Sequence, residues 1–201
     1  MSATPQLSVV VPVHNEEDNV APLVGEIVAA LRGLVDFEIV YVDDTSRDST
    51  LERLRALQVT TPELRVIRHL TNAGQSTAVR NGVKAARAPW IATLDGDGQN
   101  DPADIPKLLA QRDAAAAGIK LFERAAFLDL PYFDHMHRYL PALMQRAGWK
   151  TVSVPVNHRH RTAGVSKYNN LGRALVGIRD LRGVAWLIVR SRRTAVEELS
   201  K

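Results

Sequence analysis

Short apolar runs rich in β-branched residues alternate with segments of helical periodicity through the first half of the chain. The runs cover residues 7–13 (LSVVVPV), 37–42 (FEIVYV), 64–67 (LRVI) and 90–94 (WIATL). Continuous apolar runs are typical of strands that are covered on both faces of a sheet. Apolar residues also recur at helical spacing, as at Val20, Leu23, Val24, Ile27, Val28 and Leu31. This alternation predicts right-handed crossovers and a mainly parallel central sheet flanked by helices, and therefore an α/β fold.

Polar residues indicate where the first two helices begin. Asn15 is suited to cap the first helix, and Glu16 and Glu17 then lie in its first turn, where acids favour the helix dipole. Asp48 or Ser49 is suited to cap the second helix. The local pattern alone requires no further role for these five side chains.

Acidic and amide side chains follow three of the four predicted strands directly. They are Asp43 and Asp44 after the second strand, Asn72 beyond the third, and Asp95 and Asp97 after the fourth. In parallel α/β sheets, ligands bind beyond the carboxyl ends of the strands. Capping explains single acids such as Asp48 and Asp101, but it does not explain paired acids at the ends of two strands. We therefore predict a ligand site at this edge of the sheet.

The stretch Asp95-Gly96-Asp97-Gly98-Gln99 has the composition of a site for a divalent cation. Acids at positions i and i+2 share one face of a strand, so two carboxylates can bind one ion, and Gln99 adds a neutral oxygen. Oxygen ligands suit Mg²⁺ or Mn²⁺. The alternative is an Asp-Gly turn with solvated acids. The chain has neither a G-x-G-x-x-G nor a P-loop motif, so a bound diphosphate is expected to be held through metal.

The charge of the chain is divided unevenly along its length. Residues 1–145 hold 14 Lys and Arg against 19 Asp and Glu, a net of −5, whereas residues 146–201 hold 12 against 3, a net of +9. A basic segment of this kind favours a partner that carries phosphate. Nucleic acid is disfavoured as that partner, because the basic segment has no nucleic-acid-binding motif.

Both ends of the chain bear on its location. Residues 1–6 have neither a basic start nor an apolar core, so we expect no signal peptide and a cytoplasmic protein. Residues 171–189 combine helical apolar spacing with Arg173, Arg179, Asp180 and Arg182, and no uncharged run approaches the ~20 residues that span a bilayer. We expect either an interfacial helix, with its arginines toward lipid head groups, or a helix that closes the core.

Five short motifs stand at the ends of the predicted strands and at the start of the helices. They are Val11-Pro12-Val13-His14-Asn15-Glu16, Val42-Asp43-Asp44-Thr45-Ser46-Arg47-Asp48-Ser49-Thr50, Asn72-Ala73-Gly74, Ala78-Val79-Arg80-Asn81-Gly82 and Asp95-Gly96-Asp97-Gly98-Gln99. In this order they resemble family 2 glycosyltransferases of the GT-A fold, especially dolichyl-phosphate mannose synthases and bacterial polyprenyl-phosphate glycosyltransferases. The resemblance covers residues 7–112 and resumes from residue 118 through residue 168.

The resemblance implies an inverting, metal-dependent transfer of a hexose, mannose or glucose, from GDP-mannose or UDP-glucose to a polyprenyl phosphate. Residues that match nucleotide-binding positions are Pro12, Glu16, Asp43, Asp44, Asn72 and Asp95. Asp95, Asp97 and Gln99 match the metal ligands, which agrees with the chemistry of the stretch itself. The acceptor phosphate is already an anion at neutral pH, so its attack on the sugar needs no strong general base.

The basic residues near the end of the domain are implied to contact phosphate. They are Arg159, Arg161, Ser166 and Lys167 in the basic loop, and Arg138 before it. Asp97, Arg138 and Lys167 are therefore the candidates for catalysis. From the sequence pattern alone, a solvated basic loop is an equal alternative. His135 and His137 have no acid partner at ligand spacing, so we expect them to be structural rather than metal ligands.

One departure from the family concerns the acceptor side of the domain. Near residues 113–118 an alanine run leads directly into Lys120, where the family has a few dozen residues with further strands and arginines. The chain is therefore expected to form a shortened GT-A domain over residues 1–168 and a basic amphipathic helix or tail over residues 169–201. The alternatives are a module that binds nucleotide sugar without transferring it, and an enzyme that acts on a soluble or glycan acceptor.

Overall fold

The computed structural model describes residues 4–111, 119–157, 159 and 170–190. The chain divides into two units, Met1–Val165 and Ser166–Lys201, and each is described by itself. The boundary expected between residues 168 and 169 remains a prediction.

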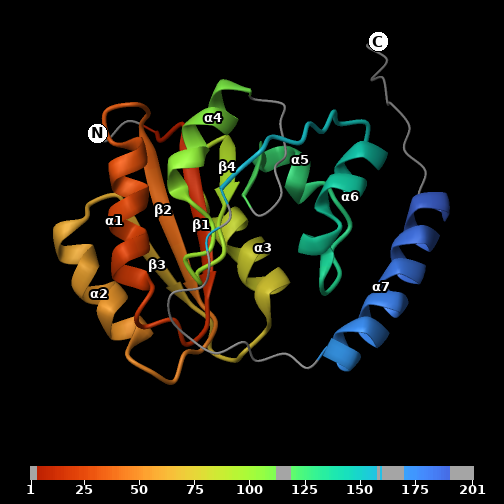
Figure 1. The fold of residues 1–201 in the computed structure, drawn as a ribbon, viewed down its shortest axis with the longest axis horizontal. Helices are drawn as coiled ribbons and strands as arrows, with labels where there is room; N and C mark the ends of the chain where they lie inside the picture. The colour runs from red at the N-terminus through yellow and green to blue at the C-terminus, as the bar shows by residue number, and fades with distance from the viewer. Residues whose placement is uncertain (1–3, 112–118, 158, 160–169, 191–201) are drawn as a thin grey trace, which may run out of the picture. The chain divides into compact units, whose positions relative to one another are not determined.

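The first unit is built on a five-stranded sheet with the strand order β3-β2-β1-β4-β5 (Figure 1). Its strands are β1 (Leu7–Val13), β2 (Phe37–Asp43), β3 (Leu64–Arg68), β4 (Trp90–Thr93) and β5 (Lys120–Glu123). The first four are parallel, and β5 pairs antiparallel with β4. The prediction of a mainly parallel α/β sheet is therefore confirmed.

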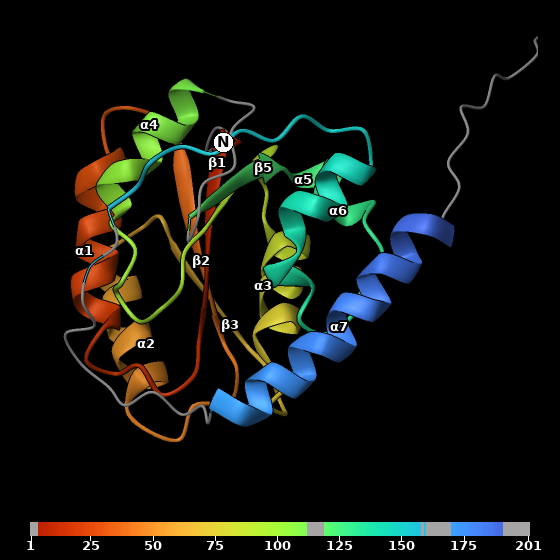
Figure 2. The ribbon, with the colours of Figure 1, turned by 45° about the vertical axis from the view of Figure 1, so that its right-hand side comes forward.

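Helices cover both faces of this sheet, as Figures 1 and 2 show. Residues of α1 (Val20–Leu31), α2 (Thr50–Thr60) and α4 (Ile105–Ala110) pack in one apolar cluster. Residues of α3 (Gln75–Ala85), α5 (Arg124–Leu128) and α6 (Leu140–Arg146) pack in the other. Two short 3-10 turns, η1 (Pro102–Asp104) and η2 (Met136–Arg138), complete the unit.

Alternate residues of β1 belong to different apolar clusters. Val9 and Val11 contribute to the cluster of α1, whereas Val10, between them, contributes to the cluster of α3, and all three are fully buried. Side chains of a strand alternate between faces, so a strand covered twice must be apolar throughout. This explains the continuous apolar runs in the sequence.

Gly82 sets a close approach between α3 and the sheet. A Cβ atom there would lie 3.0 Å from Cγ2 of Val42 and still closer to Cγ1 of Val10. The helix can pack at this distance because glycine has no side chain.

The prediction that Asn15 caps the first helix is wrong. Helix α1 begins at Val20 with Asn19 as its capping position, whereas Asn15 adopts a left-handed conformation with φ of 57°. The side chain of Asn15 instead accepts a hydrogen bond from the Arg47 amide, at 2.7 Å. Asparagine tolerates this conformation better than most residues do. Residues 14–19 therefore form a loop between β1 and α1 rather than a first helical turn.

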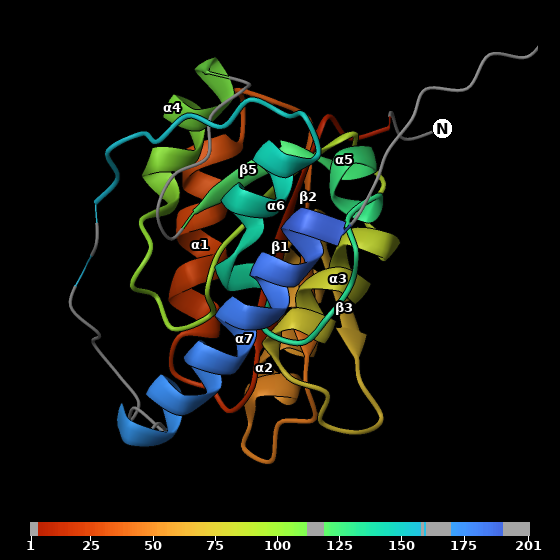
Figure 3. The ribbon, with the colours of Figure 1, turned by 90° about the vertical axis from the view of Figure 1, so that its right-hand side faces the viewer.

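The second unit contains α7 (Asn170–Arg190), which Figure 3 shows as one unbroken helix. The sequence predicted this helix, and the structure extends it by one residue at each end. Arg179 and Arg182 on it are exposed. Within the described residues, no helix combines the length and the apolar character that crossing a membrane requires.

Candidate active site

The loop after β4 carries the acidic stretch predicted to bind metal. The amide nitrogen of Asp95 donates to the Asn100 side chain at 3.2 Å, and the carboxylate of Asp97 accepts from the Gln99 amide at 3.2 Å. A Cβ atom at Gly96 would lie 2.9 Å from the Pro12 carbonyl oxygen. Only glycine therefore allows this loop to lie directly against the end of β1.

The donor set of this loop fits a hard divalent cation. Asp95 and Asp97 supply carboxylates and Gln99 an amide oxygen, the ligand types that Mg²⁺ and Mn²⁺ prefer. Within residues 4–111, 119–157, 159 and 170–190, no three Asp, Glu or His side chains are grouped closely enough to hold a metal by themselves. An ion bound here would thus take further ligands from water or a substrate, as Mg²⁺ commonly does.

Helix α3 presents its first residues to the same loop. The side-chain amide of Gln75 donates to the Asp95 carboxylate at 2.7 Å.

The hydroxyl of Ser76, also in α3, and Nδ1 of His137 are 2.7 Å apart. Burial, followed by the charges of Lys120 and Arg138, lowers the pKa of His137 to about 4. His137 is therefore neutral at pH 7 and hydrogen-bonded to Ser76, which agrees with the structural role expected for it.

Asp43 and Asp44 lie at the carboxyl end of β2, as predicted, but their environments differ. Asp43 is fully buried, and its carboxylate accepts from the Ser46 amide at 3.1 Å, with Nε of Arg68 3.8 Å away. Asp44 accepts from the amides of Ala73 and Gly74, each at 2.8 Å. Asp44 thereby binds the loop after β3 to the end of β2.

Asn72 and His14 join the same group. The Asn72 side chain donates to the backbone carbonyl of Asp44 at 3.0 Å, and Nδ1 of His14 lies 2.8 Å from that oxygen. The structure thus brings Asp44 and Asn72 together, as their positions at strand ends predicted. The contact of His14 was not predicted from the sequence, although its place directly after β1 was a signal of the same kind.

Glu16 occupies the loop between β1 and α1. Its amide donates to the Thr50 hydroxyl at 2.9 Å, and its carboxylate accepts from Asn19 at 2.7 Å. Pro12 is the penultimate residue of β1, and its carbonyl oxygen lies beside Gly96 of the metal loop. The nucleotide contacts expected of Pro12 and Glu16 remain predictions.

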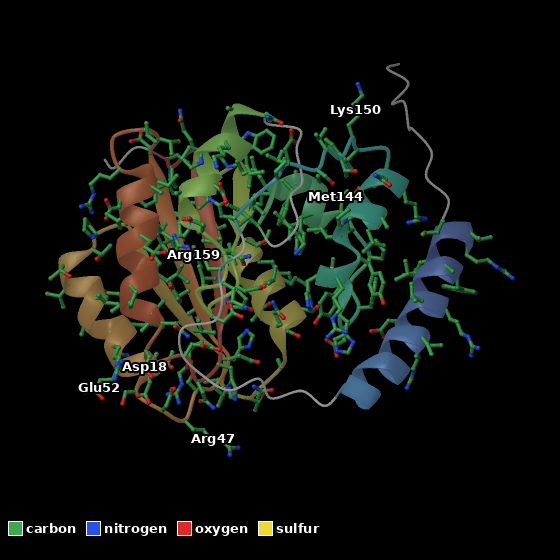
Figure 4. The ribbon with its side chains drawn as sticks, in the orientation of Figure 1. Asp18, Arg47, Glu52, Met144, Lys150 and Arg159 are labelled. Carbon is green, nitrogen blue, oxygen red and sulfur yellow. The ribbon has the colours of Figure 1, made fainter. Side chains whose placement is uncertain are left out.

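Arg159 is held by two carboxylates, and Figure 4 labels its position. Its guanidinium lies 2.8 Å from Glu26 and 2.7 Å from Asp101, and its amide donates to the Gln99 carbonyl at 2.9 Å. Burial opposes ionisation of Asp101, but hydrogen bonds from Arg159 and the Ala103 amide outweigh it and lower the pKa of that carboxyl. Arg159 thus holds the chain after β5 against the metal loop, and the phosphate contact expected of it remains a prediction.

The remaining basic candidates are placed only in part. Arg138 is exposed at the end of η2. Arg161, Ser166 and Lys167 lie outside the described residues. Lys120, for which the sequence predicted no role, begins β5 opposite Thr93 and is partly buried, and burial lowers its pKa against the opposing charge of Asp95. A strand immediately after the alanine run was not predictable from apolar periodicity.

Acids at the carboxyl ends of the strands, on a mainly parallel sheet covered by helices on both faces, agree with the GT-A fold expected from the sequence. Among solved structures, the mannosyltransferase PcManGT from Pyrobaculum calidifontis, in complex with GDP-Man and Mn²⁺, matches with a TM-score of 0.73 and 17% identity over 96% of this chain and 67% of its own. Glucosyl-3-phosphoglycerate synthase from Mycobacterium tuberculosis, with Mg²⁺ and UDP, matches with a TM-score of 0.69 and 17% identity over 92% and 79%. These likenesses establish the fold.

The sequence profile of glycosyl transferase family 2 matches residues 8–169, and the chain belongs to this family. The dodecaprenyl-phosphate galacturonate synthase of Rhizobium johnstonii is 30% identical over 91% of this chain and 67% of its own. The dolichol-phosphate mannosyltransferase of Pyrococcus furiosus is 40% identical over 52% of this chain and 29% of its own. The match spans about a third of the length of several such relatives.

Proposed function

We propose that this protein transfers a sugar from a nucleotide diphosphate sugar to a polyprenyl phosphate. The observation that carries the proposal is the continuous polar edge that runs from Asp44 and Asn72 to Gln75 and Asp95 in a family 2 chain. Relatives named for polyprenyl-phosphate and dolichol-phosphate sugar transfer support the acceptor class. Mannose and glucose, carried on GDP or UDP, are the first donors to test.

Asp95, Asp97 and Gln99 would hold a Mg²⁺ or Mn²⁺ ion at this edge. Such an ion, when bound, offsets negative charge on the leaving nucleotide diphosphate. The chain's own contribution is to hold the two carboxylates on a loop that packs directly against the end of β1 at Gly96. A carboxylate pair fixed in advance needs little reorganisation when charge develops.

The acceptor phosphate would attack the anomeric carbon directly while the bond from that carbon to the diphosphate oxygen breaks. One in-line displacement of this kind inverts the anomeric centre. No proton has to be removed from an acceptor that is already ionised, so positioning by Arg138 and Lys167 takes the place of a general base. Asp97, at the metal, completes the proposed catalytic set.

The C-terminal helix supports a location on the cytoplasmic face of the membrane. Polyprenyl phosphates are membrane lipids, so the enzyme must reach the bilayer surface. Arg179 and Arg182 on α7 are suited to anionic head groups, and Trp186 suits the depth of the interface. We propose that α7 holds the enzyme peripherally at this surface.

A transfer assay tests the proposal. Purified protein would be incubated with a short polyprenyl phosphate and radiolabelled GDP-mannose or UDP-glucose, first with Mn²⁺ and then with a chelator. Lipid-linked product that disappears on chelation is the expected result. If neither donor gives lipid-linked product, under conditions in which UDP or GDP still binds, the proposed transfer is contradicted.

The shortened acceptor side favours a second candidate, a module that binds nucleotide sugar without transferring it. Only seven residues separate Gln111 from Ile119, where the family resemblance implies a longer segment. This module would bind nucleotide and metal normally and form no product with a lipid phosphate or a soluble sugar acceptor. Turnover with a soluble sugar would instead identify a glycan-directed transferase.

A further inference from the structure

His69 links three elements beneath the nucleotide edge. It follows β3, it is 9% exposed, and its Nδ1 lies 2.7 Å from the carboxylate of Asp44 at the end of β2. Its Nε2 lies 3.0 Å from the side-chain nitrogen of Asn81 in α3. Asp44 is itself only 4% exposed. The imidazole therefore bridges a buried carboxylate and a helix that packs on the sheet.

The hydrogen-bond donors around His69 determine its tautomer. The Asn81 amide nitrogen only donates, so Nε2 must accept, and the proton of a neutral imidazole then lies on Nδ1. That proton points to Asp44, which as a carboxylate only accepts. The two hydrogen bonds thus run in one direction, from Asn81 to His69 and from His69 to Asp44.

The carboxylate that His69 holds also holds the turn of residues 72–74. Asp44 Oδ1 accepts both from His69 and from the Ala73 amide at 2.8 Å, while Oδ2 accepts from the Gly74 amide at 2.8 Å. Gly74 has φ of 81° and precedes α3, whose first residue, Gln75, donates to Asp95. The orientation of Asp44 therefore fixes both the turn and the start of the helix that reaches the metal loop.

We propose that His69 is a positioning residue of the nucleotide site, which acts through Asp44 to fix the turn of residues 72–74. It contacts no substrate in this role, because it is buried behind Asp44. The inference rests on the proposed function in one respect only, that the turn borders the nucleotide. The hydrogen bonds that carry it do not depend on sugar transfer.

Two variants of His69 separate positioning from packing. His69→Leu removes both hydrogen bonds, whereas His69→Asn keeps a donor close to the position of Nδ1. We expect His69→Leu to weaken UDP or GDP binding, and to raise the donor KM, about tenfold with kcat changed less than about threefold. His69→Asn should restore most of the loss. Ile27→Val, on the opposite face of the sheet, is the control for a general loss of stability and should leave binding unchanged.

Amide hydrogen exchange reports on the turn without any ligand. Exchange at Ala73 and Gly74 should accelerate about tenfold in His69→Leu and stay near the wild-type rate in His69→Asn and Ile27→Val. Unchanged exchange in His69→Leu, or faster exchange with unchanged nucleotide affinity, would overturn the inference. If the wild-type chain binds no nucleotide, the proposed function fails instead, and the exchange rates still decide whether His69 holds the turn.

Discussion

The two edges of the central sheet both contain buried acids, but they stabilise those acids by different means. At the amino edge, Glu38 in β2 accepts from the Ser8 hydroxyl at 2.6 Å and from the Arg87 amide at 2.6 Å. It also forms an ion pair with Arg65 at 2.6 Å. At the carboxyl edge, Asp44 is held by amides and His69, and Asp95 by Gln75.

The difference separates a structural acid from acids that are suited to a ligand. An arginine neutralises Glu38 within the chain, so nothing further is required there. Backbone amides and His69 orient Asp44, and Gln75 orients Asp95, and carboxylates held in this way can attract a metal ion. The carboxyl edge is therefore the part of the sheet where we propose that a cation binds.

Removing an acid from the carboxyl edge should have the largest effect, and it should fall on activity. Asp97→Ala is expected to lower metal-dependent transfer at least about a hundredfold, because the ion loses a carboxylate ligand. The melting temperature should change by no more than a few degrees. A transfer assay with a Mn²⁺ titration measures the first effect and thermal unfolding the second. Full activity in this variant would remove Asp97 from the proposed site.

The corresponding change at the amino edge should affect stability instead. Glu38→Gln leaves the partly buried guanidinium of Arg65 without its partner, and we expect a loss of about 2 kcal/mol in the free energy of unfolding. Glu63→Gln is the matched control, since it breaks the exposed pair of Arg32 and Glu63 and should cost less than about 1 kcal/mol. Urea unfolding measures both. Equal losses would show that the buried ion pair stabilises the fold no more than the exposed pair does.

A small steric change should distort the carboxyl edge without altering its charge. Gly96→Ala forces a Cβ atom against Val13 and the Pro12 carbonyl, so the metal loop must shift, and transfer should fall about tenfold. Gly25→Ala, in α1, is the control, because a Cβ atom there meets nothing within 4 Å. It should leave activity unchanged. Wild-type activity in Gly96→Ala would mean that transfer does not depend on the exact position of the metal loop against β1.

Mild acid should produce the smallest effect, again at the amino edge. Burial disfavours the charged form of Glu38, but hydrogen bonds from Ser8, Arg87 and Arg65 outweigh it and lower its pKa below the ordinary value of 4.5. The stabilisation from Glu38 is therefore complete above pH 4.5 and is lost as the pH falls through the lowered pKa. Unfolding midpoints measured against pH should decline less steeply in Glu38→Gln than in the wild type.

The sequence predicted the sheet well because its strands are covered on both faces and leave an uninterrupted apolar pattern. It also located the edge that bears Asp44, Asn72 and Asp95, since parallel strands end together. It did not predict β5, whose four residues include Lys120 and Glu123 and carry too little apolar pattern to distinguish a strand.

The part of the site that escaped prediction depends on contacts between distant residues. Asn15 was expected to cap a helix, but a long-range hydrogen bond to the Arg47 amide holds it in a loop. The ion pairs of Arg159 with Glu26 and Asp101 were not predicted, whereas the phosphate contact expected of it remains a prediction. A local motif indicates the chemical type of a side chain, whereas its partner is chosen by the tertiary fold.

The close packing of Gly82 also constrains how this chain can change over evolution. Any larger residue at position 82 would collide with Val10 and Val42, so the glycine can be replaced only if these two valines become smaller. Either order of change passes through a destabilised intermediate, because an overpacked core costs about 1–3 kcal/mol and a cavity in the core is also destabilising. The three positions are thus expected to vary together among descendants of this protein.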